Sequence, residues 1–266
     1  MKHLLILLLL VISIISCETG DCSSRLALVD TLLYRDMDDS AQIELDKITA
    51  KDLQETDDHA YYRLLKTQMI FRKGLVIQND SMIDQSIAYY ETSNDKQKLA
   101  QAYYFKGRML CKRGEIKDGM YFLKKAEYQA KDVNDDLLKT KIYMNIGYCI
   151  GNADDFAMSA NYFKKALEYA RFAHNNEFIL LNLENLSTIY SFLGRMDSAM
   201  ICINEYIPLI QLSSQSNQAH TFANIAALYE YIDTKKSKEY ANRSIDLMPT
   251  STAFHVLASI YTEECN

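Results

Sequence analysis

Histidines, cysteines and paired carboxylates are the side chains of this sequence that could do chemistry. Four histidines lie beyond the first few residues, at His59, His174, His220 and His255. No two of them stand four residues apart, and none belongs to a His-Glu-x-x-His sequence. The helical spacing that aims two imidazoles at one metal ion is therefore missing. We expect no metal site.

Motifs for nucleophilic catalysis and phosphate binding are missing as well. The sequence has no Gly-x-Ser-x-Gly, no Gly-Lys-Ser/Thr loop and no Cys-x-x-Cys. Acidic pairs such as Asp135-Asp136 and Asp154-Asp155 fall in predicted turns, where a carboxylate ordinarily caps a helix. We expect neither an enzyme nor a bound cofactor.

Charge and composition narrow the class further. The chain of 266 residues has 29 Lys and Arg against 35 Asp and Glu. This acidic balance argues against a nucleic-acid binder, which needs a basic face. With 8 Gly and 2 Pro, turns with special backbone angles are scarce, which disfavours an all-β sandwich. The 48% of hydrophobic residues is enough for a core.

Residues 1–16 have the pattern of a removable leader. Lys2 precedes an apolar run, residues 4–15, that is broken only by Ser13. The run is shorter than the roughly 20 residues that cross a bilayer, and it fits the core of a signal peptide. Ser16 followed by Cys17 resembles the cleavage box of bacterial lipoproteins, which implies a lipid on Cys17 and an address in the bacterial cell envelope. An ordinary secreted protein and a short membrane anchor are the alternatives.

The remainder of the chain is a repeat array. The small residues Gly107, Gly147, Ser187 and Ala226 recur at intervals of 40, 40 and 39 residues. Each lies in an apolar-periodic stretch of about 12–16 residues, which a short polar turn separates from a second such stretch. The pattern predicts helical hairpins that bury their apolar faces only by stacking.

This array resembles the tetratricopeptide repeat, in which a small residue on the first helix lets the second helix approach and aromatic residues fill the gap to the next unit. The resemblance implies an all-α, right-handed superhelical solenoid of about six helix pairs. The predicted organisation, in chain order, is a leader at 1–16, a lipidated tether at 17–25, degenerate units at 26–95, four clear units at 96–252 and a terminal capping helix at 253–266.

Local signals at the predicted helix ends have two interpretations. Asp-Ser pairs at 39–40, 80–81 and 197–198 come before apolar stretches and predict N-terminal caps. The same pairs, followed by a small apolar residue, also resemble O-glycosylation acceptors of exported bacterial proteins.

The cysteines beyond Cys17 fall into two groups. Cys111, Cys149 and Cys202 lie in predicted helices among apolar neighbours, where buried free thiols are common. Cys22 in the tether and Cys265 near the end are candidates for oxidation in an exported protein.

The resemblance also implies a binding surface, because first helices of successive units line a concave groove in this family. Asn145, Asn185 and Asn224 occupy equivalent positions, and a side-chain amide can pair with peptide backbone without reading its side chains. The alternative is that these amides are simply hydrated. The predicted groove residues are Tyr104, Arg108, Asn145, Tyr148, Asn152, Asn185, Thr188, Phe192, Asn224 and Tyr231. The basic pair of the family's carboxylate clamp is not matched.

The C-terminal stretch has an apolar stripe of Phe254, Leu257, Ala258 and Tyr261, which predicts either an amphipathic cap or a partner-binding end. The expected function is a non-catalytic, lipid-anchored scaffold with a peptide or protein in its groove. A sensory component that couples a ligand to a membrane partner is one alternative, because the layout resembles the exported half of bacterial sensor-regulators. A structural assembly factor of a lipoprotein complex is another. We predict no nucleic-acid partner, and the sequence sets no oligomeric state.

Overall fold

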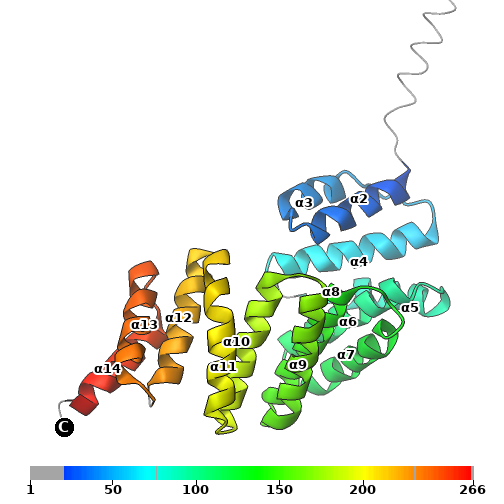
Figure 1. Cartoon of the computed structure of the whole chain (residues 1–266). Helices are drawn as coiled ribbons and strands as arrows, with labels where there is room; N and C mark the ends of the chain where they lie inside the picture. The colour runs from blue at the N-terminus through cyan, green and yellow to red at the C-terminus, as the bar shows by residue number, and fades with distance from the viewer. Residues whose placement is uncertain (1–20, 76, 231, 265–266) are drawn as a thin grey trace, which may run out of the picture. The chain divides into compact units, whose positions relative to one another are not determined.

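The computed structural model describes residues 21–75, 77–230 and 232–264, and within these ranges the chain is helical, with no strand (Figure 1). The predicted all-α fold is confirmed. The chain divides into two compact units, Met1–Val133 and Asn134–Asn266. The leader, Cys17, Tyr231 and Cys265 lie outside the described residues.

Each unit contains three helical hairpins among its described residues. In the first unit they are α2 (Cys22–Tyr34) with α3 (Asp38–Asp46), α4 (Thr56–Arg72) with α5 (Ser81–Thr92), and α6 (Lys96–Lys112) with α7 (Ile116–Ala130). In the second unit they are α8 (Asp136–Gly151) with α9 (Phe156–Phe172), α10 (Asn176–Phe192) with α11 (Met196–Tyr206), and α12 (Gln215–Tyr229) with α13 (Thr234–Leu247). A 3-10 segment, η1 (Ile207–Leu212), follows α11, and α14 (Ser251–Glu264) follows the last hairpin.

The first helices of the last four hairpins begin at 96, 136, 176 and 215, at intervals of 40, 40 and 39 residues. These are the intervals that separate the four small residues of the predicted units. At Gly107 the reason for a small residue is direct, since a Cβ there would lie 2.8 Å from Leu123 Cγ and 2.9 Å from the Gly119 carbonyl oxygen. Glycine at both positions therefore brings α6 and α7 into close contact.

A hydrogen bond of the same kind joins the two helices of three other hairpins. A buried serine on the second helix donates its hydroxyl to the carbonyl oxygen of a small residue on the first. The pairs are Ser86 to Ala60 at 2.9 Å, Ser159 to Gly147 at 2.9 Å, and Ser237 to Ala226 at 2.8 Å. The bond satisfies a hydroxyl that the close helix contact has removed from water. In α8–α9 and α12–α13 the bond lies next to the turn, whereas in α4–α5 it lies near the start of the first helix, so the degenerate hairpin forms it at a different position.

The first helix starts earlier than the sequence suggested. Leu26, Val29 and Leu33 of α2 are fully buried against α3 and α4, and Cys22 continues this stripe one turn earlier, with 9% of its surface exposed. Residues 22–25, expected in a tether, thus form the first turn of α2. The reason is the i, i+4, i+7 spacing, which lets Cys22 share the buried face.

Helix α14 packs on α12 and α13 through a different stripe from the predicted one. Ala253, Val256 and Ile260 are buried, whereas Phe254 and Tyr261 are 51% and 52% exposed. The smaller and β-branched side chains fit the closely packed interface, and the aromatic stripe stays in contact with solvent.

The expected helix caps are partly confirmed. Asp135 and Asp155 accept hydrogen bonds from backbone N–H groups three residues later, at 2.8 and 3.0 Å. The predicted caps at Asp39 and Asp197 are wrong, because α3 and α11 begin earlier and place both carboxylates inside the first turn. There they still interact favourably with the helix dipole. Asp80 stands at the N-cap position of α5 but makes no capping bond.

Candidate functional site

The predicted groove residues of the second unit lie on α8, α10 and α12 or at their ends. Helix α10 contacts both α8 and α12. Asn145 and Tyr148 are on α8, and Asn152 is the exposed residue that ends it. Three others, Asn185, Thr188 and Phe192, are on α10, and the exposed Asn224 is on α12.

The amide groups of this surface are already partly engaged. Asn145 Nδ2 donates to the Lys141 carbonyl oxygen at 2.8 Å, and Asn185 Nδ2 donates to the Leu181 carbonyl oxygen at 2.6 Å. Each amide thus bonds to its own helix one turn back. A second bond runs from Asn185 Nδ2 to the Tyr148 hydroxyl, 2.8 Å away, and joins α10 to α8. Asn185 therefore offers a partner its side-chain oxygen, which accepts hydrogen bonds from N–H groups.

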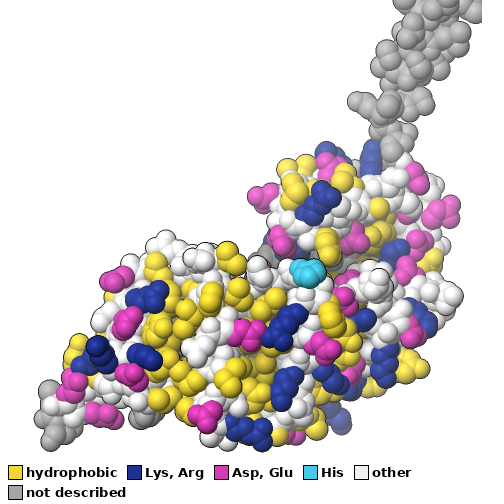
Figure 2. Space-filling view, in the orientation of Figure 1, with side chains coloured by type: hydrophobic (Ala, Val, Ile, Leu, Met, Phe, Trp, Pro, Cys, Tyr) yellow, Lys and Arg dark blue, Asp and Glu magenta, His cyan; other side chains and the backbone are white. Residues whose placement is uncertain are grey.

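Two aromatic rings flank these amides. Tyr148 is 37% exposed and meets Phe163 edge-on, with ring centroids 5.1 Å apart. Phe192 is 62% exposed and stacks on Phe156 at 5.0 Å. Phe156 was not among the predicted residues, although its place directly after the α8–α9 turn was a usable signal. Figure 2 shows hydrophobic side chains gathered over α10 to α12 in the second unit. Exposed rings held by neighbouring rings are suitable anchors for a partner.

In the first unit the prediction for Tyr104 is wrong. Its side chain is only 3% exposed and packs against the Phe105 ring, with centroids 5.1 Å apart. Arg108 covers this site, with its guanidinium 5.1 Å from the Phe71 ring centroid and NH1 donating to the Tyr104 hydroxyl at 3.1 Å. Tyr104 is therefore a core residue, because the helix turns it toward the preceding hairpin.

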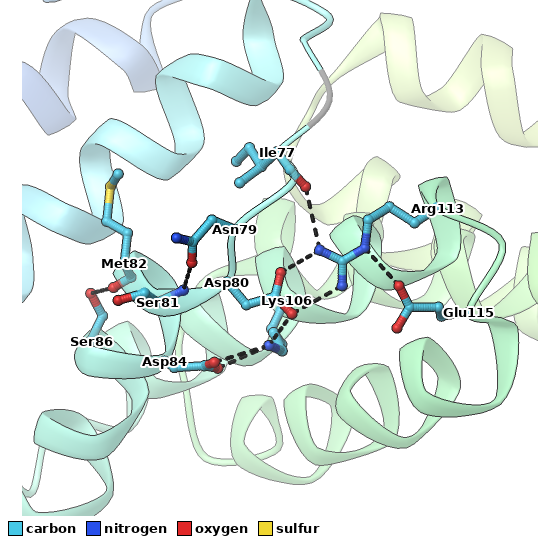
Figure 3. A network of polar contacts seen from close by, with 10 residues as sticks. All are labelled: Ile77, Asn79, Asp80, Ser81, Met82, Asp84, Ser86, Lys106, Arg113 and Glu115. Atoms are coloured by element: carbon cyan, nitrogen blue, oxygen red, sulfur yellow. Dashed lines mark hydrogen bonds and ion pairs between the residues drawn. The ribbon is translucent and has the colours of Figure 1, made fainter.

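The strongest polar network of the first unit centres on Asp80 (Figure 3). Its carboxylate pairs with Lys106 Nζ at 2.6 Å and with the Arg113 guanidinium, whose NH2 lies 2.9 Å away. Lys106 also contacts Asp84 at 3.0 Å, and Arg113 Nε contacts Glu115 at 2.7 Å. The hydrogen bond from Arg113 is the main reason why the pKa of Asp80 falls to about 2. Each charged group has at least one oppositely charged partner, so the network holds the start of α5 against α6.

The second unit contains a buried carboxyl group, Glu184, beside the amide surface. Burial raises its pKa, while a hydrogen bond from Thr221 acts in the opposite direction. Its Oε1 and the hydroxyl of Tyr206 have no hydrogen-bond partner among the described residues. Burial shifts the protonation equilibrium of this carboxyl group toward its neutral form, because a charge is costly to remove from water.

Other candidates were placed as follows. Cys149 and Cys202 are buried cysteines outside any disulfide, as predicted, whereas Cys111 is only half-buried. Lys125 of α7 and Lys165 of α9 cover tyrosine rings, with Lys125 Nζ 4.5 Å from the Tyr103 centroid and Lys165 Nζ 5.5 Å from the Tyr143 centroid. In the part of the chain that the structure describes, His, Cys, Asp and Glu form no group of three or more that could hold a metal ion. The helices in that part include none with the length and apolar character of a membrane span.

Comparison with known proteins agrees with this geometry. A model described as tetratricopeptide repeat matches residues 140–172, which cover most of α8 and all of α9. No curated protein matches the chain by sequence.

Among solved structures, the apo form of the quorum sensor NprR from B. thuringiensis is similar, with a TM-score of 0.72 and 18% identity over 92% of this chain and 72% of that one. NprR in complex with its cognate peptide NprX gives 0.68 and 18%, over 92% and 75%. PilF of Pseudomonas aeruginosa gives 0.63 and 15%, over 90% and 97%. The fold is thus that of the tetratricopeptide-type helical solenoids.

Proposed function

We propose that this protein is a non-catalytic, lipid-anchored scaffold that binds a peptide or protein segment along α8, α10 and α12. The observation that carries the proposal is the link between Asn185 and Tyr148, which sets an amide and an exposed ring side by side on successive first helices. An extended segment could donate its backbone N–H groups to the amide oxygens and bury its side chains against Tyr148 and Phe192. The peptide complex of the similarly folded NprR supports this class of ligand.

The test is retention of peptides by the full chain. A library of random decapeptides is passed over immobilised protein, and retained peptides are counted by mass spectrometry. We expect the double variant Asn145→Ala plus Asn185→Ala to lose most retained peptides. The matched control is Asn161→Ala, which changes an exposed amide on α9. Equal retention by the double variant and the wild type would contradict the proposal.

The lipid anchor is a separate part of the proposal and rests on the sequence around Cys17. In a bacterial host, radiolabelled palmitate should enter the wild-type chain and the Cys22→Ser variant but not Cys17→Ser. Label that persists in Cys17→Ser excludes this anchor. The envelope location follows from the same attachment, and its inner- or outer-membrane position is measured by fractionating the labelled cells.

The exposed stripe of α14 supports a second candidate, a signalling component that contacts a membrane partner through its last helix. Phe254 and Tyr261 expose about half of their side chains there. In-cell crosslinking to envelope proteins should then be lost in Phe254→Asp and kept in the Asn145→Ala plus Asn185→Ala variant. The reverse pattern favours the groove.

A further inference from the structure

A pocket of about 410 Å³ lies in the second unit where η1, α12 and α13 meet. The pocket exists because α11, the second helix of the hairpin α10–α11, ends early. Helix α11 has 11 residues, whereas α7 has 15 and α9 has 17. Pro208 lies at the start of η1, where it cannot donate a backbone hydrogen bond, and its ring disfavours continuation of the α-helix. The chain therefore leaves the α11 axis as a 3-10 turn, and the pocket opens beside it.

About half of the pocket's lining is polar, and the other half consists of apolar walls. They are formed by Ile207, Pro208 and Ile210 of η1, Phe222 of α12 and Leu247 of α13. None of these residues belongs to the predicted groove, so the pocket is a separate site. An apolar wall of this size suits one or two bulky side chains of a ligand.

One cation stands over this wall. The Arg243 guanidinium carbon lies 4.2 Å from the centroid of the Phe222 ring and 5.5 Å from that of Tyr240. Among the described residues, no carboxylate forms an ion pair with Arg243. Contact with the ring fixes the plane of the guanidinium, which leaves its fork of N–H groups for a carboxylate.

The remaining polar groups of the pocket complement this cation. Asp246, one helical turn after Arg243, also lines the pocket and can accept a hydrogen bond. Gln218 is held in place by donating its Nε2 to the Ser213 carbonyl oxygen at 2.8 Å, and Gln211 lies at the exposed rim. A donor for carboxylate and an acceptor for N–H therefore flank one apolar wall.

We propose that this pocket binds an apolar side chain carried next to a free carboxylate, as at the C-terminal residue of a peptide or in a free apolar amino acid. The carboxylate pairs with the fork of Arg243, the side chain packs against Phe222 and the isoleucines, and the N–H on the same carbon donates to Asp246. A peptide C-terminus and a free amino acid both carry the carboxylate, the side chain and the N–H group on one carbon atom. The geometry of a bidentate Arg–carboxylate pair gives the site its selectivity for an acid over an amide.

The probe is a fluorescein-labelled peptide, Gly-Ser-Gly-Ser-Gly-Phe, with either a free C-terminal carboxylate or a C-terminal amide. Binding to the full chain in mild detergent is measured by fluorescence anisotropy. We expect the acid to bind about tenfold more tightly than the amide, and Arg243→Gln to remove about that factor for the acid alone. Arg195→Gln, which changes another exposed arginine of the second unit, is the matched control.

Each outcome bears on the proposal. Competition by free L-phenylalanine assigns the site to amino acids, and its failure together with binding of the acid assigns it to peptide termini. Equal binding of acid and amide overturns the proposal, as does unchanged binding of the acid in Arg243→Gln. The Asn145→Ala plus Asn185→Ala variant should bind this probe like the wild type, so failure of the groove leaves the pocket testable. Arg243 is exposed and contacts the fold through the Phe222 and Tyr240 rings, so Arg243→Gln should remain folded by circular dichroism, with a melting curve close to that of the wild type.

Discussion

Asn185 on α10 donates a hydrogen bond from Nδ2 to the hydroxyl of Tyr148 on α8, over 2.8 Å. The bond joins the first helices of two successive hairpins on the surface that the sequence indicated as the binding face. Asn185 also keeps its bond to the Leu181 carbonyl, so its amide position is fixed from both sides. In the proposed function, a bound segment would meet an oriented group, which lowers the entropy lost on binding.

Tyr148→Phe tests this link. The variant loses the hydroxyl but keeps the ring on Phe163, so we expect the free energy of unfolding to fall by only about 0.5–1 kcal/mol. Urea denaturation measures the change. The control is Tyr128→Phe, since that ring is 68% exposed and should tolerate the change with no measurable loss. A loss in Tyr148→Phe no greater than in the control would mean that water replaces the bond at no cost.

Gly107→Ala and Gly147→Ala should differ although the two residues are equivalent in the repeat. A Cβ at 107 meets backbone atoms of Gly119 and Leu123 at 2.9 Å, whereas at 147 its nearest neighbours are atoms of the Phe163 side chain, at 3.2 Å or more. Backbone of two helices cannot move aside as a ring can. We expect Gly107→Ala to lose about 1–3 kcal/mol.

Gly147→Ala should stay within about 1 kcal/mol of the wild type, because the helix preference of alanine offsets the tighter contact. The measurement is again urea denaturation of both variants. Equal losses in the two would argue against the close approach of α6 and α7.

Asp80 should make stability dependent on pH at the acid end. Its pKa is about 2 in the folded protein against an ordinary 3.8, so the folded state binds this proton less readily than the unfolded state. The contribution is complete above the ordinary pKa and is lost as the pH falls toward about 2. In Asp80→Asn this part of the acid dependence should disappear.

At neutral pH Asp80→Asn should lose about 2 kcal/mol, because Lys106, with 8% of its side chain exposed, keeps only Asp84 as an ion-pair partner. Thermal unfolding between pH 2 and 7 measures both effects. Asp118→Asn on α7 is the control, and it should leave the acid profile as in the wild type.

Glu184 should affect the pH dependence of stability in the direction opposite to Asp80. Burial raises its pKa above the ordinary 4.5, so the folded state binds this proton more readily, and stability falls as the pH rises above that value. Glu184→Gln has no charge to bury. We expect it to match the wild type in acid and to be more stable at neutral pH. Urea denaturation of the wild type and of Glu184→Gln at pH 4 and pH 8 measures this difference. A variant that is less stable than the wild type at both pH values would contradict the role of burial.

The regular part of the fold was predictable because its signals are local. The small residues at 107, 147, 187 and 226 recur at the repeat period, and at Gly107 the close contact of α6 with α7 explains the small residue. The carboxylates of Asp135 and Asp155 cap helices for the same local reason. The caps at Asp39 and Asp197 failed because packing extended α3 and α11 toward their N-termini, which no local rule of capping includes.

Side-chain roles on the candidate surface were less predictable. From their positions in the repeat, Tyr104 and Asn185 were both predicted to face the groove. Those positions could not indicate that Arg108 covers Tyr104, or that Tyr148 comes within hydrogen-bonding distance of Asn185. These contacts depend on side chains about 4 to 40 positions apart, whose rotamers are chosen by packing.

The sequence by itself determined that the chain is an array of helical hairpins, since periodic apolar residues and small residues at a fixed interval permit few other ways to bury a core. Only the tertiary structure decided which groups are left to bind a partner. Proline at 208 is a single local signal, yet the pocket below Arg243 arises from the meeting of η1, α12 and α13. Likewise, the stripe of α14 that is buried was settled by the fit of Val256 and Ile260 to the preceding hairpin, because two apolar stripes on one helix compete and packing selects between them.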